Sequence, residues 1–223
     1  MSGKRDSGKD FVYGRRPVTE AHRGRRRVRR VWTTDDLPPG ELSRLAGSPD
    51  HQGIVAEVDP YPYADRNALL RREGELIVAL DQVQDPRNLG AVCRSAEAAG
   101  AAGVVIPERR AAGVTAAACK ASAGAVEHLP VARVRNLTDW LASAKEAGAW
   151  TYGADGDAPT SFRTLDYSGR VVIVLGGEEA GLRPRVAGAC DELVAIPTVG
   201  RIGSLNVSAA AAVLLFAVAE AHS

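Results

Sequence analysis

The sequence predicts an α/β protein whose main domain is a parallel β-sheet covered by helices, preceded by a small N-terminal domain. Two observations predict this class. From residue 75 onward, short apolar runs alternate with longer stretches of helical periodicity, which is the pattern of successive βαβ units. Several of the apolar runs are continuous rather than alternating, as expected for strands that helices cover on both faces.

The N-terminal part of the chain gives weaker signals. Residues 1–10 are polar and contain glycine, and we expect a disordered tail. Apolar runs at 28–32 and 53–58 predict strands of a domain over residues 11–59, which is too small for a substantial core and must pack against something larger. Residues 60–74 are expected to form a linker, kept extended by prolines that disfavour helix at their own and the preceding position.

The main domain is expected to span residues 75–223. Its apolar runs predict strands at 76–80, 104–106, 131–134, 150–152, 171–175 and 193–196. Helical periodicity predicts helices at 89–99, 115–121, 137–147 and 206–221. Because helices lie between most of these strands, the strands are expected to run parallel in a doubly wound sheet.

The charge of the chain is unevenly distributed. The net charge of the whole chain is +1, but residues 1–31 contain eleven Lys or Arg and only three acidic residues. The densest basic run predicts contacts with nucleic-acid phosphates, because each cation that neutralises a phosphate releases condensed counterions. The candidate nucleic-acid-binding residues are Arg25, Arg26, Arg27, Arg29 and Arg30. The alternative is a solvated tail that keeps the chain soluble.

Composition excludes several classes of protein. Cys93, Cys119 and Cys190 are scattered and lack metal-ligand spacing, which favours buried thiols in a reducing compartment over disulfides or a zinc site. No apolar run approaches the roughly 20 residues that span a bilayer. The polar, basic start of the chain lacks the apolar segment of a secretory signal. We therefore expect a cytoplasmic protein with no membrane partner and no metal.

The first candidate site loop follows the strand at 76–80 and leads into a helix. Asn88 is placed to cap that helix by accepting from free backbone N–H groups. Arg94 stands in an otherwise small and apolar helix, and its guanidinium could hold a phosphate or a carboxylate in two-point geometry. An interhelix salt bridge is an equally good explanation for this arginine.

The second loop follows the strand at 171–175. Gly176 and Gly177 permit close approach of the backbone to a ligand. Adjacent carboxylates at Glu178 and Glu179 do not suit a glycosidase, whose two carboxylates flank the scissile bond. The glycines also lack the spacing of a dinucleotide-binding fingerprint.

The third loop, residues 196–208, contains Gly200 and Gly203 and leads into the last helix. A glycine-bearing loop at a helix N-terminus suits a polar or anionic ligand. The loop lacks the lysine and the spacing of a P-loop, which argues against a nucleoside triphosphate. Ser204 and Asn206 could equally be simple helix caps. All three loops follow strands, where ligands bind in open α/β sheets.

The three loops, in this order, resemble the three signature motifs of the SpoU (TrmH-type) family of RNA ribose 2′-O-methyltransferases. The similarity is carried by residues 85–96, by 174–182, and by 196–197 together with 204–208. It extends over residues 75–223. Residues 51–56 resemble the end of the family's N-terminal substrate domain, in the branch that methylates a guanosine of 23S rRNA.

The resemblance implies a fold, a cofactor and a set of site residues. The fold would be the SPOUT-type parallel sheet with a C-terminal trefoil knot, plus a shortened L30e-like N-terminal domain that lacks about a helix and a strand between Trp32 and His51. S-adenosylmethionine would bind in the knot, and the protein would be a homodimer in which Arg94 of one subunit lies near the cofactor of the other. The cofactor-binding residues would be Gly176, Ile196, Leu205, Ala154 and Leu175, and the catalytic residues Arg94, Asn88, Glu178, Ser204 and Asn206.

Three alternatives remain open. The substrate could be a tRNA ribose, or an rRNA site whose methylation confers antibiotic resistance. The protein could be a catalytically silent RNA-binding or ribosome-assembly factor, although intact Asn88, Arg94, Glu178 and Asn206 argue against it. A small-molecule enzyme such as a nucleotide-binding reductase is disfavoured by the missing glycine fingerprint and by the basic N-terminal segment.

Overall fold

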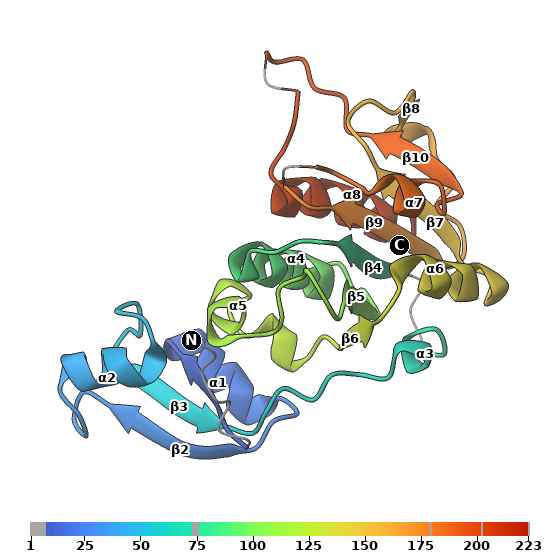
Figure 1. The fold of residues 1–223 in the computed structure, drawn as a ribbon. Helices are drawn as coiled ribbons and strands as arrows, with labels where there is room; N and C mark the ends of the chain where they lie inside the picture. Colours follow the sequence, from blue (N-terminus) through green and yellow to red (C-terminus); the bar gives the residue numbers. More distant parts are fainter. Residues whose placement is uncertain (1–7, 73–75, 179, 202, 223) are drawn as a thin grey trace.

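The structure, a computed structural model, describes residues 8–72, 76–178, 180–201 and 203–222. Residues 1–7 of the expected disordered tail lie outside this range, and so does Glu179. Figure 1 shows the N-terminal domain beside α5 (Ala116–Ala121), with a linker that runs from β3 (Ile54–Val58) to α3 (Arg66–Leu69).

The N-terminal domain is a three-stranded antiparallel sheet with two helices. Its elements are β1 (Asp10–Tyr13), α1 (Arg15–Arg23), β2 (Val28–Thr33), α2 (Pro39–Ala46) and β3 (Ile54–Val58), and the strand order is β1-β3-β2. The predicted strands are β2 and β3. The first strand and both helices were not predicted, and β1 begins at Asp10, within the expected tail. The segment between Trp32 and His51, expected to be shortened, contains α2.

Local chemistry explains where α2 begins and ends. Pro39 is its first residue, where a fixed φ suits a helix and the missing N–H costs nothing. Gly47 ends it in the left-handed region, with φ of +65°, and donates its N–H to the carbonyl of Ser43. The helix buries Leu42 against Tyr13 and Val55 in a small core of this domain.

The main domain is a seven-stranded sheet in the order β6-β5-β4-β9-β7-β10-β8, and every described pairing of its strands is parallel. The strands are β4 (Leu76–Asp81), β5 (Gly103–Pro107), β6 (Val131–Val134), β7 (Trp150–Ala154), β8 (Thr160–Ser161), β9 (Val171–Gly176) and β10 (Glu192–Ala195). The helices are α4 (Pro86–Ala98), α5 (Ala116–Ala121), α6 (Leu137–Glu146), α7 (Pro184–Ala187) and α8 (Val207–Ala221), with 3-10 turns η1 (Ala125–Glu127) and η2 (Phe162–Thr164). The expected linker is not extended throughout, because α3 (Arg66–Leu69) forms within it behind the cap Asp65. All six predicted strands and four predicted helices of this domain are present. The threading of the C-terminal segment through a knot stays a prediction.

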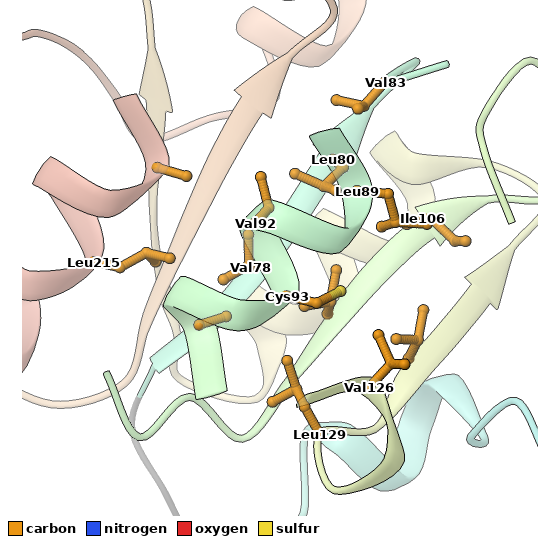
Figure 2. Packing of buried hydrophobic residues seen from close by; sticks show 14 of the residues in the cluster. Val78, Leu80, Val83, Leu89, Val92, Cys93, Ile106, Val126, Leu129 and Leu215 are labelled. Atoms are coloured by element: carbon orange, nitrogen blue, oxygen red, sulfur yellow. The ribbon is translucent and has the colours of Figure 1, made fainter. Parts of the chain in front are cut away.

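Helices cover both faces of the sheet, as the continuous apolar runs predicted. Along β4, Val78 and Leu80 face a cluster that includes residues of α4, α5 and α8, whereas Ile77 and Ala79 face a second cluster with α6 and α7. Figure 2 shows the first cluster, in which Leu215 of α8 also lies. No helix of the described residues is long and apolar enough to cross a bilayer.

The N-terminal domain packs on this first cluster rather than standing alone. Val12, Ala21 and Val58 are buried in the same core as Val78 and Leu80. The expectation that so small a domain must pack against a larger one is therefore confirmed. The linker takes part in this packing, because Tyr61 is 7% exposed.

Candidate functional site

A cavity of about 300 Å³ opens at the carboxyl ends of β7, β9 and β10. All five residues expected to bind a cofactor line it, together with Glu178 and Ser204 from the expected catalytic set. The cofactor residues are Ala154 at the end of β7, Leu175 and Gly176 at the end of β9, Ile196 after β10, and Leu205 before α8. The strand ends meet here because parallel strands bring their carboxyl ends to one edge of the sheet.

Gly176 is required by the turn that follows β9. A Cβ atom at this position would lie 2.0 Å from the carbonyl carbon of Gly181, which is far inside van der Waals contact. Gly181 has φ of +62° and donates its N–H to the carbonyl of Gly177 over 3.1 Å. The loop therefore folds back on itself at backbone contact, and this places Glu178 at the rim of the cavity.

A chain of hydrogen bonds joins the three motif loops. The amide nitrogen of Asn88 donates to Oε1 of Glu178 over 2.5 Å, and the amide nitrogen of Asn206 donates to Oδ1 of Asn88 over 3.2 Å. Asn206 also caps α8, since its Oδ1 accepts from the N–H of Ser208 over 2.9 Å. The structure thus brings together residues that lie far apart in the sequence. Asn88 is 90 positions from Glu178 and 118 positions from Asn206.

The expectation that Asn88 caps α4 is wrong. Asp85 is the cap, because its Oδ1 accepts from the N–H of Arg87 over 2.8 Å and Pro86 occupies the first helical position. Asn88 is therefore a residue of the first turn, and its side chain is free to reach across to the other two loops.

Arg94 lies on α4 and is exposed, and it does not line the cavity of its own subunit. It follows Asn88 by six residues, which corresponds to about 9 Å along the helix axis. Its side chain makes no ion pair within the described part of the chain, so the alternative of an interhelix salt bridge is wrong for these residues. A role for Arg94 at the cavity of a second subunit stays a prediction.

The charged groups that line the cavity are carboxylates. Asp155 and Glu178 belong to the lining, and no described lining residue is basic. Asp155 and Gly156 were not predicted as site residues, although a glycine-bearing polar loop after an apolar strand is the same signal that identified the other loops. Asp155 accepts from the N–H of Asp157 over 3.0 Å, so this segment forms a turn. In the described residues, no group of three or more acidic, histidine or cysteine side chains could hold a metal ion.

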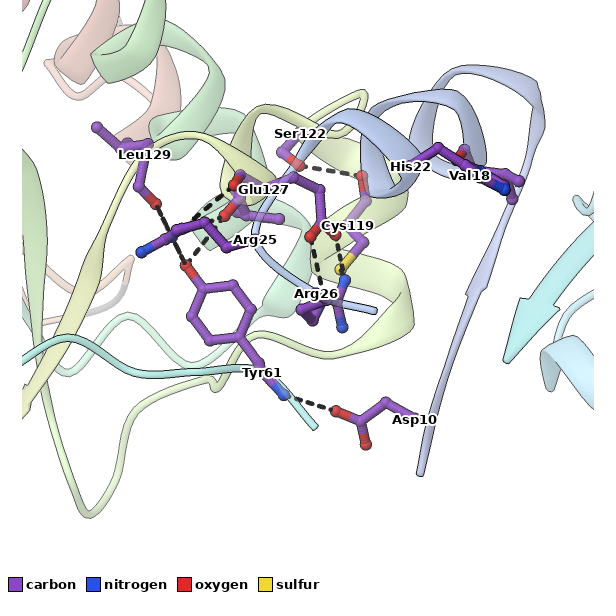
Figure 3. Close-up of polar contacts among 11 residues, drawn as sticks. Asp10, Val18, His22, Arg25, Arg26, Tyr61, Cys119, Ser122, Glu127 and Leu129 are labelled. Atoms are coloured by element: carbon purple, nitrogen blue, oxygen red, sulfur yellow. Dashed lines mark hydrogen bonds and ion pairs between the residues drawn. The ribbon is translucent and has the colours of Figure 1, made fainter. Parts of the chain in front are cut away.

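The basic run does not form a free RNA-binding arm. Arg26 is 5% exposed and forms a two-point ion pair with Glu127 of η1, in which its Nε donates to Oε2 over 2.9 Å (Figure 3). The prediction that Arg26 contacts RNA is therefore wrong, because the other domain already neutralises its charge. The neighbouring Arg25 donates to the carbonyl oxygens of Glu127, Val126 and Leu129 and to the hydroxyl of Tyr61.

The remaining arginines of the run lie on the surface. Arg29 pairs with Asp59 over 2.5 Å, and the guanidinium of Arg30 lies 4.8 Å from the ring centroid of Trp32. Arg27 is exposed. His51, next to the segment that was expected to be shortened, is 6% exposed and accepts from the N–H of Gly53 through Nδ1, which is a structural role.

Comparison with known proteins identifies the family. The chain matches the SpoU rRNA Methylase family over residues 75–216. It belongs to this family. It is 37% identical to YacO of Bacillus subtilis, named a TrmH family tRNA/rRNA methyltransferase, over 94% of both chains. It is 45% identical to an uncharacterized tRNA/rRNA methyltransferase of a Mycobacterium species, over 83% of this chain and 60% of that longer protein.

A solved SpoU methyltransferase has the same fold along its length. AviRb from Streptomyces viridochromogenes, in complex with the cofactor AdoMet, superposes with a TM-score of 0.81. The two proteins are 29% identical, and the similarity covers 99% of this chain and 94% of AviRb. The similarity therefore includes the N-terminal domain as well as the SpoU domain.

Proposed function

We propose that the protein is a homodimeric methyltransferase that moves the methyl group of S-adenosylmethionine to a ribose 2′-hydroxyl of structured RNA. A guanosine of 23S rRNA is the proposed target, and a tRNA ribose is the alternative. The observation that carries the proposal is the meeting of Asn88, Glu178 and Asn206 beside the cavity at the carboxyl ends of the strands. Membership of the SpoU rRNA Methylase family and the AdoMet complex of AviRb support it.

The cavity fits S-adenosylmethionine chemically. Its apolar walls include Leu175, Val194 and Ile196, which suit an adenine ring, and its size lies at the lower end of the usual range for ligand pockets. S-adenosylmethionine carries a sulfonium and an ammonium against one carboxylate, so its net charge is positive. Lining carboxylates at Asp155 and Glu178, without a basic residue among the described ones, favour such a ligand over a phosphate.

Arg94 is proposed to act on the RNA. A ribose hydroxyl is a poor nucleophile, and S-adenosylmethionine supplies an electrophilic methyl group for it. An arginine remains protonated, so it does not serve well as a general base. We expect its guanidinium to hold the phosphate beside the target ribose and to stabilise the developing alkoxide, while that phosphate assists loss of the proton. The hydrogen-bonded chain through Asn88 would fix the loops and Ser204 around the ribose.

The test is methyl transfer to RNA with a mapped product. Incubation with labelled S-adenosylmethionine and total bacterial RNA should label one ribose, and mapping of that ribose distinguishes 23S rRNA from tRNA. Arg94→Ala should abolish the transfer while leaving the affinity for S-adenosylmethionine near that of the unaltered protein. Full turnover by Arg94→Ala, or label on a base, would contradict the proposal.

A heterodimer tests whether Arg94 acts across the subunit interface. We suggest coexpression of two differently tagged variants, Arg94→Ala and Leu205→Arg, and purification of the heterodimer that carries both tags. Leu205→Arg places a cation in the cavity, and the chain should still fold because this position is 46% exposed. If Arg94 serves the cavity of the other subunit, the doubly tagged heterodimer keeps one complete site of two, and its activity should be about half of the original. Action within one subunit predicts no activity, because each chain then lacks one part of its own site.

A further inference from the structure

Three exposed arginines lie at the carboxyl edge of the sheet. Arg87 lies in the first turn of α4, and Arg109 and Arg110 lie in the loop between β5 and α5. In the part of the chain that the structure describes, none of the three makes a side-chain hydrogen bond or an ion pair. The nearby acidic side chains already have other partners. Oε2 of Glu108 lies 3.8 Å from Nε of Arg135, and the carboxylate of Asp85 caps α4.

These arginines lie on one continuous edge of the molecule. The N–H of Ala112 donates to the carbonyl of Val83 over 2.8 Å, which ties the β5–α5 loop to the loop before α4. Arg87 precedes Asn88, whose bond to Glu178 reaches the rim of the cavity. The edge carrying the arginines therefore starts beside the proposed methyl-transfer site.

The other end of this edge reaches the N-terminal domain. The helix α5 begins directly after the arginine loop, and Ala116 packs against the small core of the N-terminal domain. Further along α5, the Nζ of Lys120 lies 5.8 Å from the ring centroid of Tyr13. An RNA that entered the cavity could thus follow the edge as far as this domain without leaving the protein surface.

The backbone at Arg110 points to a role for its side chain. Its φ of +57° lies in the left-handed region, which glycine adopts easily and arginine does not. The hydrogen bonds of Ala112 to Val83 and of Glu108 to Val134 fix the loop on both sides of it. A side chain held in a strained backbone on an exposed loop is a feature that concentrates at ligand-binding positions.

We infer that RNA lies along this edge, with Arg87, Arg109 and Arg110 on its phosphates, between the methyl-transfer site and the N-terminal domain. The inference rests on the proposed function, since it takes RNA as the substrate. The forked guanidinium of arginine matches phosphate oxygens in two-point geometry. The buried Arg26 is not available for such a contact, because Glu127 already neutralises it.

The test compares two pairs of adjacent exposed arginines. The variant Arg109→Ser with Arg110→Gly removes both charges, and glycine also fits the positive φ at 110, so the loop should keep its fold. The matched control is Arg71→Ala with Arg72→Ala, which lies ahead of β4 at the opposite edge of the sheet. Binding of unmodified 23S rRNA is measured by filter retention over a range of salt concentrations, with calorimetry of S-adenosylmethionine as the measure of cavity integrity.

Binding is expressed as the slope of the logarithm of the binding constant against the logarithm of the salt concentration. The edge variant should reduce the magnitude of this slope by about 0.7 to 0.9 for each phosphate that the protein no longer neutralises, and the control should leave the slope unchanged. At saturating RNA its kcat should be unchanged while its KM for RNA rises, and Arg87→Ala should act in the same direction. An unchanged slope, or an equal decrease in the control, would overturn the inference. Because the readout is binding, absence of methyl transfer by the unaltered protein would overturn the proposed function separately.

Discussion

Removal of Glu127 should strongly destabilise the whole protein, because this residue neutralises a charge that is buried between the two domains. The side chains of Arg26 and Glu127 are 2% and 0% exposed, and the pair is formed at two points. Glu127→Ala would leave a guanidinium inside the interface with the Sγ of Cys119, 3.3 Å away, as its main remaining partner. Loss of one member of a buried pair costs about 3–5 kcal/mol, because the other charge stays desolvated.

The predicted size of the effect is large enough to measure by thermal unfolding. For a chain of this length, each kcal/mol shifts Tm by roughly 2–4 °C, so Glu127→Ala should lower Tm by about 6–20 °C. The double variant Arg26→Met with Glu127→Leu should restore most of the stability, since apolar side chains of similar volume replace both charges. Circular dichroism and calorimetry of the unaltered protein, Arg26→Met, Glu127→Leu and the double variant give the coupling energy directly, with Glu127→Ala measured beside them.

Two results would refute this reasoning. A Tm for Glu127→Ala within about 2–4 °C of the unaltered protein would mean a cost near 1 kcal/mol, which is the range of a solvated surface pair. A double variant less stable than either single variant would mean that the apolar packing around the pair, and not its charge, dominates the interface.

The other predictions concern the cavity and the cysteines. Gly176→Ala should abolish binding of S-adenosylmethionine in calorimetry, because the added Cβ would lie 2.0 Å from a backbone carbon. The control Gly40→Ala should bind normally, because no atom lies within 4 Å of the Cβ added there. Asn88→Ala should lower kcat/KM by about 10²-fold, since misplacement of loops by about 1 Å costs this much, and single-turnover assays would show it; activity within twofold would contradict that role. Burial raises the pKa of Cys93 to about 12 and that of Cys119 to about 11, so the thiolate fraction rises only above pH 10. Both thiols should therefore resist a thiol reagent at pH 8 until the protein is unfolded; rapid labelling of the native protein would count against their burial.

The main domain was predictable because its signals are local. The six predicted strands contain short apolar runs, and a strand such as β4 is apolar on both faces because helices cover both. The short β8 (Thr160–Ser161) is polar and was not predicted. The convergence of Asn88, Glu178 and Asn206 followed from a single rule, that parallel strands bring their carboxyl ends to one edge. The cap of α4 was misassigned, because Pro86 fixes the helix start earlier than the apolar periodicity suggested.

The N-terminal domain was not predictable in the same way. The helix α1 buries only Pro17, Val18 and Ala21, while its arginines dominate the local composition and give the impression of a solvated arm. The partner of Arg26 stands 101 residues further along the chain. No local pattern in one sequence reveals a pairing over that separation, so a buried arginine was mistaken for a phosphate contact.

The ion pair between the two domains limits how this enzyme can be rebuilt. A designer who exchanged residues 10–59 for an RNA-recognition module, in order to retarget the modification, would also remove Arg26. The remaining scaffold would then present Glu127 as an uncompensated anion beneath the new module. A working chimera must therefore either supply a cation at that point or convert Glu127 to a neutral side chain first.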